Sequence, residues 1–337
     1  MDKIYVLCTL EHGLSIVDSI KDSVPIAGII GLSNRDSTDQ VSGYKFVKSY
    51  CDKNSFEFIE VETYNLSSDK DKSKILSYEI DIILVCGWQR LVPNWLINHV
   101  KCNVIGAHGS PYGINGGRGR SPLNWALILG KLDFHLSIFS IDSGVDSGKI
   151  IGTSGFEISE LDNITTCRKK ANAEISRLII KNFSSRKIFG KDFKSQEGEV
   201  KYLPQRIPKD GQIDWNLNSS QLYNFIRAQS KPFPGAFTTH NGKIVKIWTS
   251  KKIKTNVSKD YNNGEIIKIV NDKSFHVKCY DGVILVDNFS NDDKIMLEEG
   301  MIFESSNFKE QMGTIIERHY SKYPLFELCE DIHNLAN

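Results

Sequence analysis

The segment of residues 80–105 reads IDIILVCGWQRLVPNWLINHVKCNVI and predicts a strand, a helix and a second strand in succession. Ile80–Cys86 is a short, continuous apolar run, which is typical of a strand buried on both faces. Pro93 stands in the first turn of a helix that extends to Val100, and the strand Asn103–Ile105 follows. This alternation favours an α/β fold with an open, mostly parallel sheet and helices over both faces.

The same alternation continues on both sides of this segment. We expect strands at Lys3–Cys8, Val24–Leu32, Phe56–Val61 and Phe134–Ser140, and helices at Leu14–Ile20, Tyr44–Lys53, Leu123–Leu129 and Thr165–Asn182. Between them, Gly113–Gly119 (GINGGRG) predicts a flexible loop that matches neither a phosphate-binding nor a dinucleotide-binding fingerprint. Ligands of such sheets bind beyond the carboxyl ends of the strands.

The C-terminal part changes to short strands with regular turns. A helix at Ser220–Ala228 is followed by hairpin signals at Asn241-Gly242 and Asp281-Gly282. We expect six strands that build a small barrel, at Phe237–His240, Ile244–Ser250, Gly264–Val270, Ser274–Cys279, Val283–Phe289 and Met301–Glu304. The predicted domains are therefore 1–190, a polar linker at 191–204, the barrel at 205–305 and a helical tail at 306–337.

Composition limits the class of protein. The 337 residues are 40% hydrophobic and 25% charged, which is typical of a soluble globular protein with room for two domains. A net charge of +1 argues against a nucleic-acid partner. The seven cysteines are scattered without metal-ligand spacing, so we expect reduced thiols and no metal. Neither a membrane span nor a signal peptide is evident, so we expect a cytoplasmic protein without a membrane partner.

His108 is the first candidate for a functional side chain. The strand Asn103–Ile105 leads into Gly106-Ala107-His108-Gly109-Ser110, and a second glycine-framed turn reads Gly144-Val145-Asp146-Ser147-Gly148. Glycine lets a backbone approach a ligand closely. A histidine and an aspartate on two such loops can handle protons. A lone histidine is more often structural, and an Asp-Ser-Gly sequence is more often only a turn.

Three ordered motifs resemble the folate-dependent formyltransferases, a family that includes methionyl-tRNA formyltransferase and the nucleotide-sugar N-formyltransferases. They are the His108 region with Arg118–Trp125 (RGRSPLNW), the Asp146 turn, and Arg206–Trp215 with Pro232–Phe237. The RGRSPLNW wording is most similar to the sugar enzymes. The resemblance implies a Rossmann-like N-terminal sheet, an OB-like C-terminal barrel, and 10-formyltetrahydrofolate as the cosubstrate.

The resemblance also implies roles for particular residues. His108 and Asp146 would be catalytic, the loop after the central strand would bind the pterin with the Asp142 turn, and further residues would bind the acceptor. The expected pterin contacts are Cys86, Gly87, Trp88, Gln89, Arg90, Leu91, Asp142 and Gly144, and the expected substrate contacts are Gly109, Ser110, Arg118, Arg120, Asn124 and Arg227.

Some of these side chains have an ordinary alternative. Trp88 suits stacking on a ligand but also core packing. Arg118 and Arg120 suit phosphate or carboxylate contacts but also surface salt bridges. Arg227 belongs to a motif that faces the substrate cleft in sugar formyltransferases, and domain packing is equally compatible with its position.

The chain departs from the family at Gly106, where the family has a catalytic asparagine. Asn103 lies three residues earlier and could take that place after a shift of the loop. A backbone N–H, a water molecule, Asn115 or Asn124 are the other candidates for the missing amide.

The first functional hypothesis is formyl transfer to the amino group of a nucleotide-linked amino sugar, with a homodimer possible. The second is methionyl-tRNA formyltransferase, for which a continuous basic surface would be the distinguishing feature. The third is a folate- or nucleotide-sugar-binding protein without catalysis, because Gly106 removes one of the three expected catalytic side chains.

Overall fold

The structure is a computed structural model that describes residues 2–34, 43–253 and 260–337. The chain divides into two compact units, and each is assembled from several segments. The first unit is Met1–Arg118, His135–Phe156 and Lys169–Glu199, and the second is Gly119–Phe134, Glu157–Arg168 and Val200–Asn337. The domain boundaries that the sequence predicts, at residues 190 and 205, stay a prediction.

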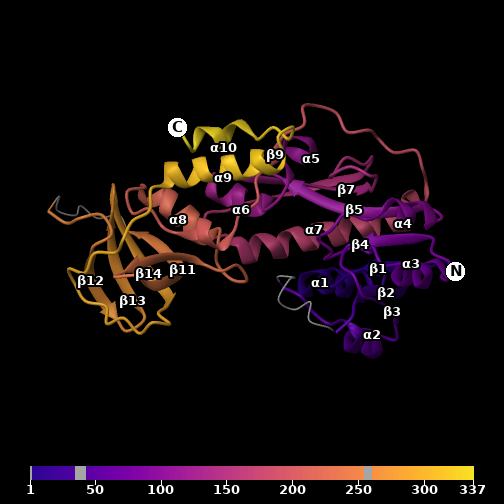
Figure 1. The fold of residues 1–337 in the computed structure, drawn as a ribbon, viewed down its shortest axis with the longest axis horizontal. Helices are drawn as coiled ribbons and strands as arrows, with labels where there is room; N and C mark the ends of the chain where they lie inside the picture. Colours follow the sequence, from indigo (N-terminus) through magenta and orange to yellow (C-terminus); the bar gives the residue numbers. More distant parts are fainter. Residues whose placement is uncertain (1, 35–42, 254–259) are drawn as a thin grey trace. The chain divides into compact units, whose positions relative to one another are not determined.

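A seven-stranded sheet in the order β3-β2-β1-β4-β5-β7-β8 forms the core of the first unit within the described residues (Figure 1). Its strands are β1 (Ile4–Leu7), β2 (Ile26–Leu32), β3 (Glu57–Val61), β4 (Ile82–Val85), β5 (Asn103–Ser110), β7 (Asp133–Ser140) and β8 (Ile150–Glu157). The pairs from β3 to β5 are parallel, whereas β5 and β7 are antiparallel. The mostly parallel α/β sheet expected from the sequence is thus confirmed.

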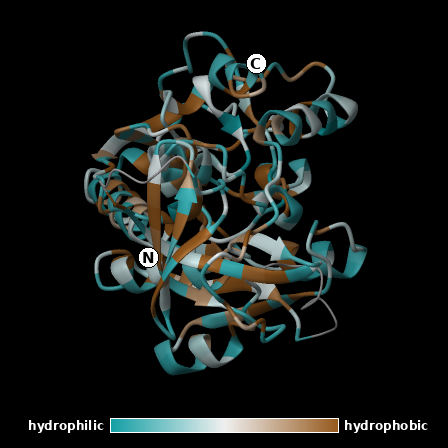
Figure 2. Cartoon of the chain, turned by 90° about the vertical axis from the view of Figure 1, so that its left-hand side faces the viewer, coloured by the Kyte–Doolittle hydropathy of each residue, from teal (hydrophilic) through white to brown (hydrophobic). Residues whose placement is uncertain are grey.

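Helices cover both faces of this sheet. One hydrophobic cluster joins the strands to α1 (Glu11–Ile20) and to the part of α7 (Ile164–Ser184) that belongs to the first unit. The other cluster includes side chains of α3 (Asp69–Leu76) and α4 (Asn94–His99). The strand segments are accordingly hydrophobic and the outer helices largely hydrophilic in Figure 2. Two buried faces explain why the central strands β1, β2 and β4 lack polar–apolar alternation.

Several elements of the first unit differ from the expectation. The segment predicted to be a flexible loop contains α5 (Gly113–Gly116) and the two-residue strand β6 (Arg118–Gly119), because the side chains of Ser110, Asn115 and Arg118 hold it internally. α2 (Lys48–Asn54) begins four residues after the predicted start at Tyr44. α3 and β8 were not expected: α3 buries only Asp71 and Ile75, and β8 contains glycine and is half exposed.

The second unit contains a five-stranded antiparallel sheet in the order β10-β11-β14-β13-β12. Its strands are β10 (Ala236–His240), β11 (Lys243–Ile253), β12 (Ile266–Asn271), β13 (Ser274–Cys279) and β14 (Gly282–Ser290). The predicted strand Met301–Glu304 is instead two isolated bridges, Ile302 to Glu265 and Glu304 to Thr239. These bridges join the segment to both edges of the sheet, and the OB-like topology stays a prediction.

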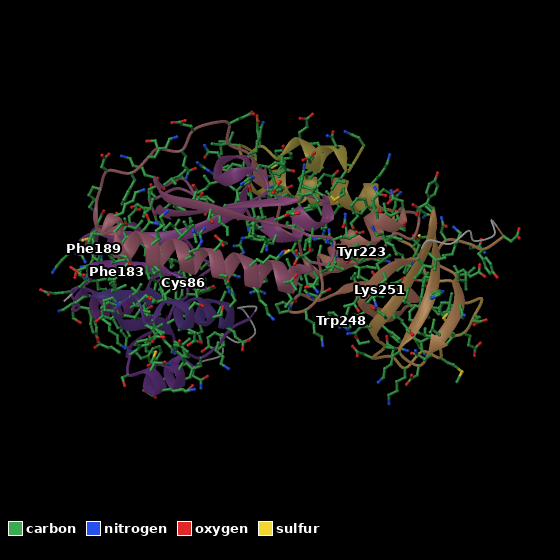
Figure 3. The ribbon with its side chains drawn as sticks, turned by 180° about the vertical axis from the view of Figure 1, so that it is seen from behind. Cys86, Phe183, Phe189, Tyr223, Trp248 and Lys251 are labelled. Carbon is green, nitrogen blue, oxygen red and sulfur yellow. The ribbon has the colours of Figure 1, made fainter. Side chains whose placement is uncertain are left out.

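The remaining elements complete the second unit. They are α6 (Pro122–Ile128), the short strand β9 (Tyr202–Leu203) paired with β6, α8 (Ser219–Arg227), α9 (Phe308–Lys322) and α10 (Glu330–Asn334), with one-turn helices at Lys187–Phe189 in the first unit and Pro208–Gly211 in the second. The segment predicted to be a helical tail contains α9 and α10, which bury the side chains of Met312, Ile315 and Ile332. In Figure 3, Tyr223 projects from α8, and Trp248 and Lys251 project from β11.

No helix in the described part of the chain is long and apolar enough to cross a bilayer.

Candidate active site

His108 lies inside β5 rather than in a loop after it, which corrects the sequence expectation. The parallel pairing of β5 with β4 ends at Ile105, but the antiparallel pairing with β7 continues to Ser110. His108 is paired with Ser137 in that ladder. Beyond Ile105, therefore, the edge of β5 that faces β4 is unpaired, and side chains there can face a cavity.

The imidazole of His108 has a partner on each nitrogen. Nε2 lies 2.8 Å from the carbonyl oxygen of Gly117, and Nδ1 lies 3.4 Å from Oδ2 of Asp146. A carbonyl oxygen only accepts, so Nε2 carries a proton. The His108 side chain is 9% exposed and that of Asp146 is 23% exposed. The predicted pair of functional side chains is thus brought together in a sheltered position.

The Asp146 turn has an unusual backbone. Asp146 has a φ of +50°, which few residues other than glycine, asparagine and aspartate adopt. The turn must also pass close to β7, because a Cβ atom at Gly148 would lie 1.8 Å from the carbonyl oxygen of Ser140. Two hydrogen bonds from Gln196 Nε2, of 2.8 Å to the Asp146 carbonyl and 2.7 Å to the Gly148 carbonyl, fasten the turn.

A pocket of about 240 Å³ is lined by Asp146, whereas His108 is not among its lining residues. It is lined by the segment Val85–Val92 without Cys86, by Gly106 and Ala107, and by Gly144 and Asp146. Phe139 and Ile141 of the β7 end form an apolar wall, and His12 contributes from α1. The pocket therefore lies at the carboxyl end of β4, beside the part of β5 that extends past it, and the ends of parallel strands are where open α/β sheets bind ligands.

The loop after β4 contains the predicted pterin contacts. Gly87 has a φ of +79°, and a Cβ atom there would lie 2.9 Å from the Cα atom of Gly13. Five of the six predicted residues of this loop line the pocket, namely Gly87, Trp88, Gln89, Arg90 and Leu91. Cys86 is not among the lining residues and is buried. The sequence thus located the pocket wall correctly, and its binding role stays a proposal.

Trp88 combines the two roles that the sequence left open. Its ring packs edge-on against Tyr64 at 4.8 Å, and the residue is 7% exposed. It nevertheless lines the pocket, and its buried Nε1 has no hydrogen-bond partner among the described residues. A buried N–H without a partner is costly, so this donor is available to a bound group.

Asp142 and Gly144 stand at the other side of the pocket. Asp142 Oδ1 accepts hydrogen bonds of 3.0 Å from Gly144 N and 2.5 Å from Ser147 Oγ. Gly144 lines the pocket, whereas the exposed Asp142 does not. Asp142 therefore stabilises the loop that presents Gly144 and Asp146.

Most of the predicted substrate contacts of the first unit have structural roles. Gly109 is paired with Leu136 in the sheet. Ser110 is fully buried and donates to the Gly113 carbonyl, and Arg118 is 9% exposed and donates to Asn115 and Gln196. The salt-bridge alternative for Arg118 is also wrong, because these partners are neutral amides. Arg120, in the second unit, is exposed and donates its backbone N–H to Leu203.

Asn124 and Arg227 lie in the second unit and are occupied by packing. Asn124 Nδ2 donates to the Ala228 carbonyl at 2.6 Å. Arg227 donates from Nη1 to the carbonyls of Ser159 and Asp162 and from Nε to Asn224. Burial lowers the pKa of this guanidinium. These contacts favour the packing alternative for Arg227, and they occupy one of the two donors of the Asn124 amide.

Two further side-chain candidates for the missing amide, Asn103 and Asn115, have hydrogen-bond partners elsewhere. Asn103 donates to the carbonyls of Ile188 and Gly190 and accepts from Ser140, so both hydrogens of its amide are used where β5 begins. The Asn115 amide donates to the Glu197 carbonyl. The shift of Asn103 considered in the sequence analysis is therefore wrong.

Gly106 lies on the same face of β5 as His108, because the two are separated by two residues. A Cβ atom at Gly106 would lie 3.0 Å from two carbons of the Ile141 side chain and 3.1 Å from Cζ of Phe139. These two apolar side chains thus crowd the position from which an asparagine would extend. Glycine is therefore the residue that fits this position of the pocket wall without displacing its neighbours.

We expect Gly106→Asn to leave turnover unchanged or to lower it, because the new side chain would push Ile141 and Phe139 into the pocket. Steady-state kinetics with Gly106→Ala as the control would separate the effect of the crowded Cβ atom from that of the amide. A large rise in turnover with unchanged substrate KM would show instead that the natural site lacks a needed donor.

Four functional candidates were missed at the sequence level. His12, Phe139 and Ile141 line the pocket, and Gln196 fastens the Asp146 turn. His12 follows β1, and the other two belong to the end of β7, so the strand-end rule would have found all three. Gln196 gave no signal, because it stands in a polar segment that resembles a linker.

None of the seven cysteines, all of which lie in the described residues, forms a disulfide. Burial raises the pKa of Cys8 to about 12 and also raises that of Cys86, whose position at the end of β4 is marked in Figure 3. A thiol is nucleophilic only as the thiolate. Covalent catalysis by Cys86 beside the pocket is therefore disfavoured.

Comparison with known families identifies the fold. The family model of the formyl transferase domain matches residues 26–182, and the model of the formyl transferase C-terminal domain matches residues 206–307. The chain belongs to the formyltransferase family. This assignment confirms the resemblance that the His108, Asp146 and Arg206 motifs carried.

Individual formyltransferases are related more distantly. A methionyl-tRNA formyltransferase of Caldicellulosiruptor saccharolyticus is 31% identical over 207 residues, which are 60% of this chain and 64% of that protein. The chain thus spans less than two thirds of that relative.

Two solved structures share the fold. HypX of Aquifex aeolicus, in complex with tetrahydrofolic acid, has a TM-score of 0.61 at 14% identity and covers 94% of this chain and 47% of its own. An N-formyltransferase of Helicobacter canadensis, with folinic acid and dTDP-3-aminofucose, has a TM-score of 0.58 at 18% identity and covers 86% and 100%.

Proposed function

We propose that this formyltransferase takes the formyl group from 10-formyltetrahydrofolate and transfers it to the amino group of a nucleotide-linked amino sugar. The observation that carries the proposal is His108, held between the Gly117 carbonyl and the carboxylate of Asp146, a residue that lines the pocket. A histidine beside a carboxylate is suited to a reaction in which one nitrogen loses a proton while another gains one.

The reaction requires such a proton movement. The acceptor amine attacks the formyl carbon, a carbon–nitrogen bond forms, and the bond from that carbon to N10 of the folate breaks. The amine loses one proton and N10 gains one. In our proposal His108 and Asp146 move this proton.

The pocket fits the head group of a folate. Ligand pockets for whole drug-sized molecules typically measure about 300–1,000 Å³. The cavity of about 240 Å³ therefore suits a bicyclic ring, with the remainder of the cosubstrate outside. Phe139 and Ile141 supply an apolar wall, and the unpartnered Nε1 of Trp88 supplies a donor. We propose that Trp88 and the backbone of Gly87–Leu91 hold the pterin.

The charge distribution favours a small acceptor over a polyanion. Several basic side chains of the second unit lie beside carboxylates, among them Lys201 with Glu327, Lys246 with Asp292, Lys251 with Asp287 and Arg318 with Asp210. Pairing of this kind weakens the attraction for a phosphate backbone. A nucleotide diphosphate needs only a few donors, and Arg120 is an exposed candidate.

The second candidate acceptor is methionyl-tRNA, which the 31% identical relative favours. Incubation with 10-formyltetrahydrofolate and, separately, with a panel of dTDP- and UDP-linked amino sugars and with methionyl-tRNA would distinguish the two. We expect release of tetrahydrofolate only with an amino sugar. Formylation of methionyl-tRNA alone would overturn the proposed acceptor, and binding of folate and nucleotide sugar without turnover would favour a binding protein.

A further inference from the structure

The segment around Gln196 belongs to the first unit, although its composition resembles a linker. The N–H of Ile150 in β8 donates to the Lys194 carbonyl at 2.8 Å, and Asn115 donates to the Glu197 carbonyl at 2.7 Å. Residues on both sides of Gln196 are therefore fixed to secondary structure. The Gln196 side chain is held between them and is partly buried.

The Gln196 amide makes three hydrogen bonds with unambiguous directions. Nε2 donates to the carbonyls of Asp146 and Gly148, and Oε1 accepts a hydrogen bond of 2.8 Å from Arg118 Nη2. A carbonyl only accepts and a guanidinium only donates, so the amide cannot be turned over. Each hydrogen of the amide nitrogen has a partner.

These bonds connect the two partners of His108. Arg118 follows Gly117, whose carbonyl lies 2.8 Å from Nε2 of His108. Asp146, which faces Nδ1, is fastened by its own carbonyl. One side chain thus joins the peptide segments on opposite sides of the imidazole. Arg118 is a rigid anchor for this link, because it is 9% exposed and also donates to Asn115.

The Asp146 backbone needs such a link. A positive φ in a residue other than glycine persists only when its surroundings determine it. The neighbouring residues of the turn are partly exposed, and Gly148 contributes no side chain. The amide of Gln196 reaches the carbonyls on either side of Ser147, and it therefore fixes the direction in which the Asp146 carboxylate points.

We propose that Gln196 is a positioning residue that sets the distance between His108 and Asp146, an inference that rests on the proposed formyl transfer at this site. Gln196 does not touch the reacting groups. It acts through the Asp146 turn on one side and through Arg118 and Gly117 on the other.

The test is Gln196→Glu, which keeps an acceptor for Arg118 but places a carboxylate oxygen against the carbonyls of Asp146 and Gly148. We expect kcat to fall about 10- to 100-fold, as for a misplaced catalytic group, with little change in either KM. In an Asp146→Asn background the same substitution should cause a smaller further fall, because part of the effect of Gln196 runs through that carboxylate. The matched control is Glu197→Gln. It also exchanges a carboxylate and an amide, but at the exposed side chain of the next residue, and it should leave kcat unchanged.

A second readout does not depend on activity. The ring nitrogen signals of His108, assigned by comparison with His108→Ala in histidine-labelled protein, should shift in Gln196→Glu and not in Glu197→Gln. Wild-type kcat in Gln196→Glu, or an equal fall in both backgrounds, would overturn the inference. If the wild-type protein formylates no acceptor, the proposed function has failed, and unchanged His108 signals would then overturn the positioning role separately.

Discussion

His108→Ala should abolish most turnover while the protein stays folded. The ring is the group of β5 that faces Asp146 across the pocket edge, and it carries the proton-handling step of the proposed reaction. Loss of a general acid or base typically costs about 10²- to 10⁴-fold in rate. The substitution leaves the Gly117 carbonyl without its ring partner, which costs about 1–3 kcal/mol of stability.

The measurement is kcat together with thermal unfolding followed by circular dichroism. His135→Ala is the matched control, because His135 is an exposed histidine on the neighbouring strand β7, paired with Ser110. It should retain wild-type turnover. If His108→Ala does so as well, His108 has no part in the chemistry and the proposed mechanism is wrong.

Asp146→Asn should lower kcat by about 10²- to 10⁴-fold with the turn intact. Asparagine tolerates the φ of +50°, so the backbone bonds to Gln196 can persist. The new amide would donate to Nδ1 of His108 and hold the neutral ring with its proton on Nε2. A proton arriving from the amine would then find neither a free ring nitrogen nor a carboxylate.

Single-turnover rates and the unfolding midpoint would be compared with those of Asp22→Asn, an exposed carboxylate remote from the pocket lining. The control should match the wild type in both. A decrease of only a few-fold in Asp146→Asn would mean that Asp146 is a turn residue and that another group accepts the proton.

The local sequence pattern was sufficient to predict features that depend on one continuous segment of the chain. The apolar run ending at Cys86 predicted β4, which the structure contains. The sequences around His108 and Asp146 predicted the pair that lies 3.4 Å apart. Each of these depends on residues adjacent in the chain or on a family motif.

Sequence patterns did not predict the roles of polar side chains whose hydrogen-bond partners lie in distant segments. Arg118 was expected at a ligand, but its guanidinium is buried against Gln196, 78 residues away. Asn103 was considered as a replacement amide, but it is bound to Ile188 and Gly190, which are more than 80 residues away. A polar residue near a site does not reveal from its own sequence whether folding has already supplied its partners.

The sequence by itself determined the buried strands, the mostly parallel α/β sheet, and the identities of the histidine and the aspartate, because hydrophobic periodicity and glycine placement are local properties. Only the tertiary structure decided that β5 continues past its parallel neighbour, that Ile141 and Phe139 crowd Gly106, and that Gln196 ties the Asp146 turn to Arg118. These features are hydrogen bonds and close contacts between segments that are distant in the sequence. They form only where the tertiary structure brings those segments together, and composition does not determine them.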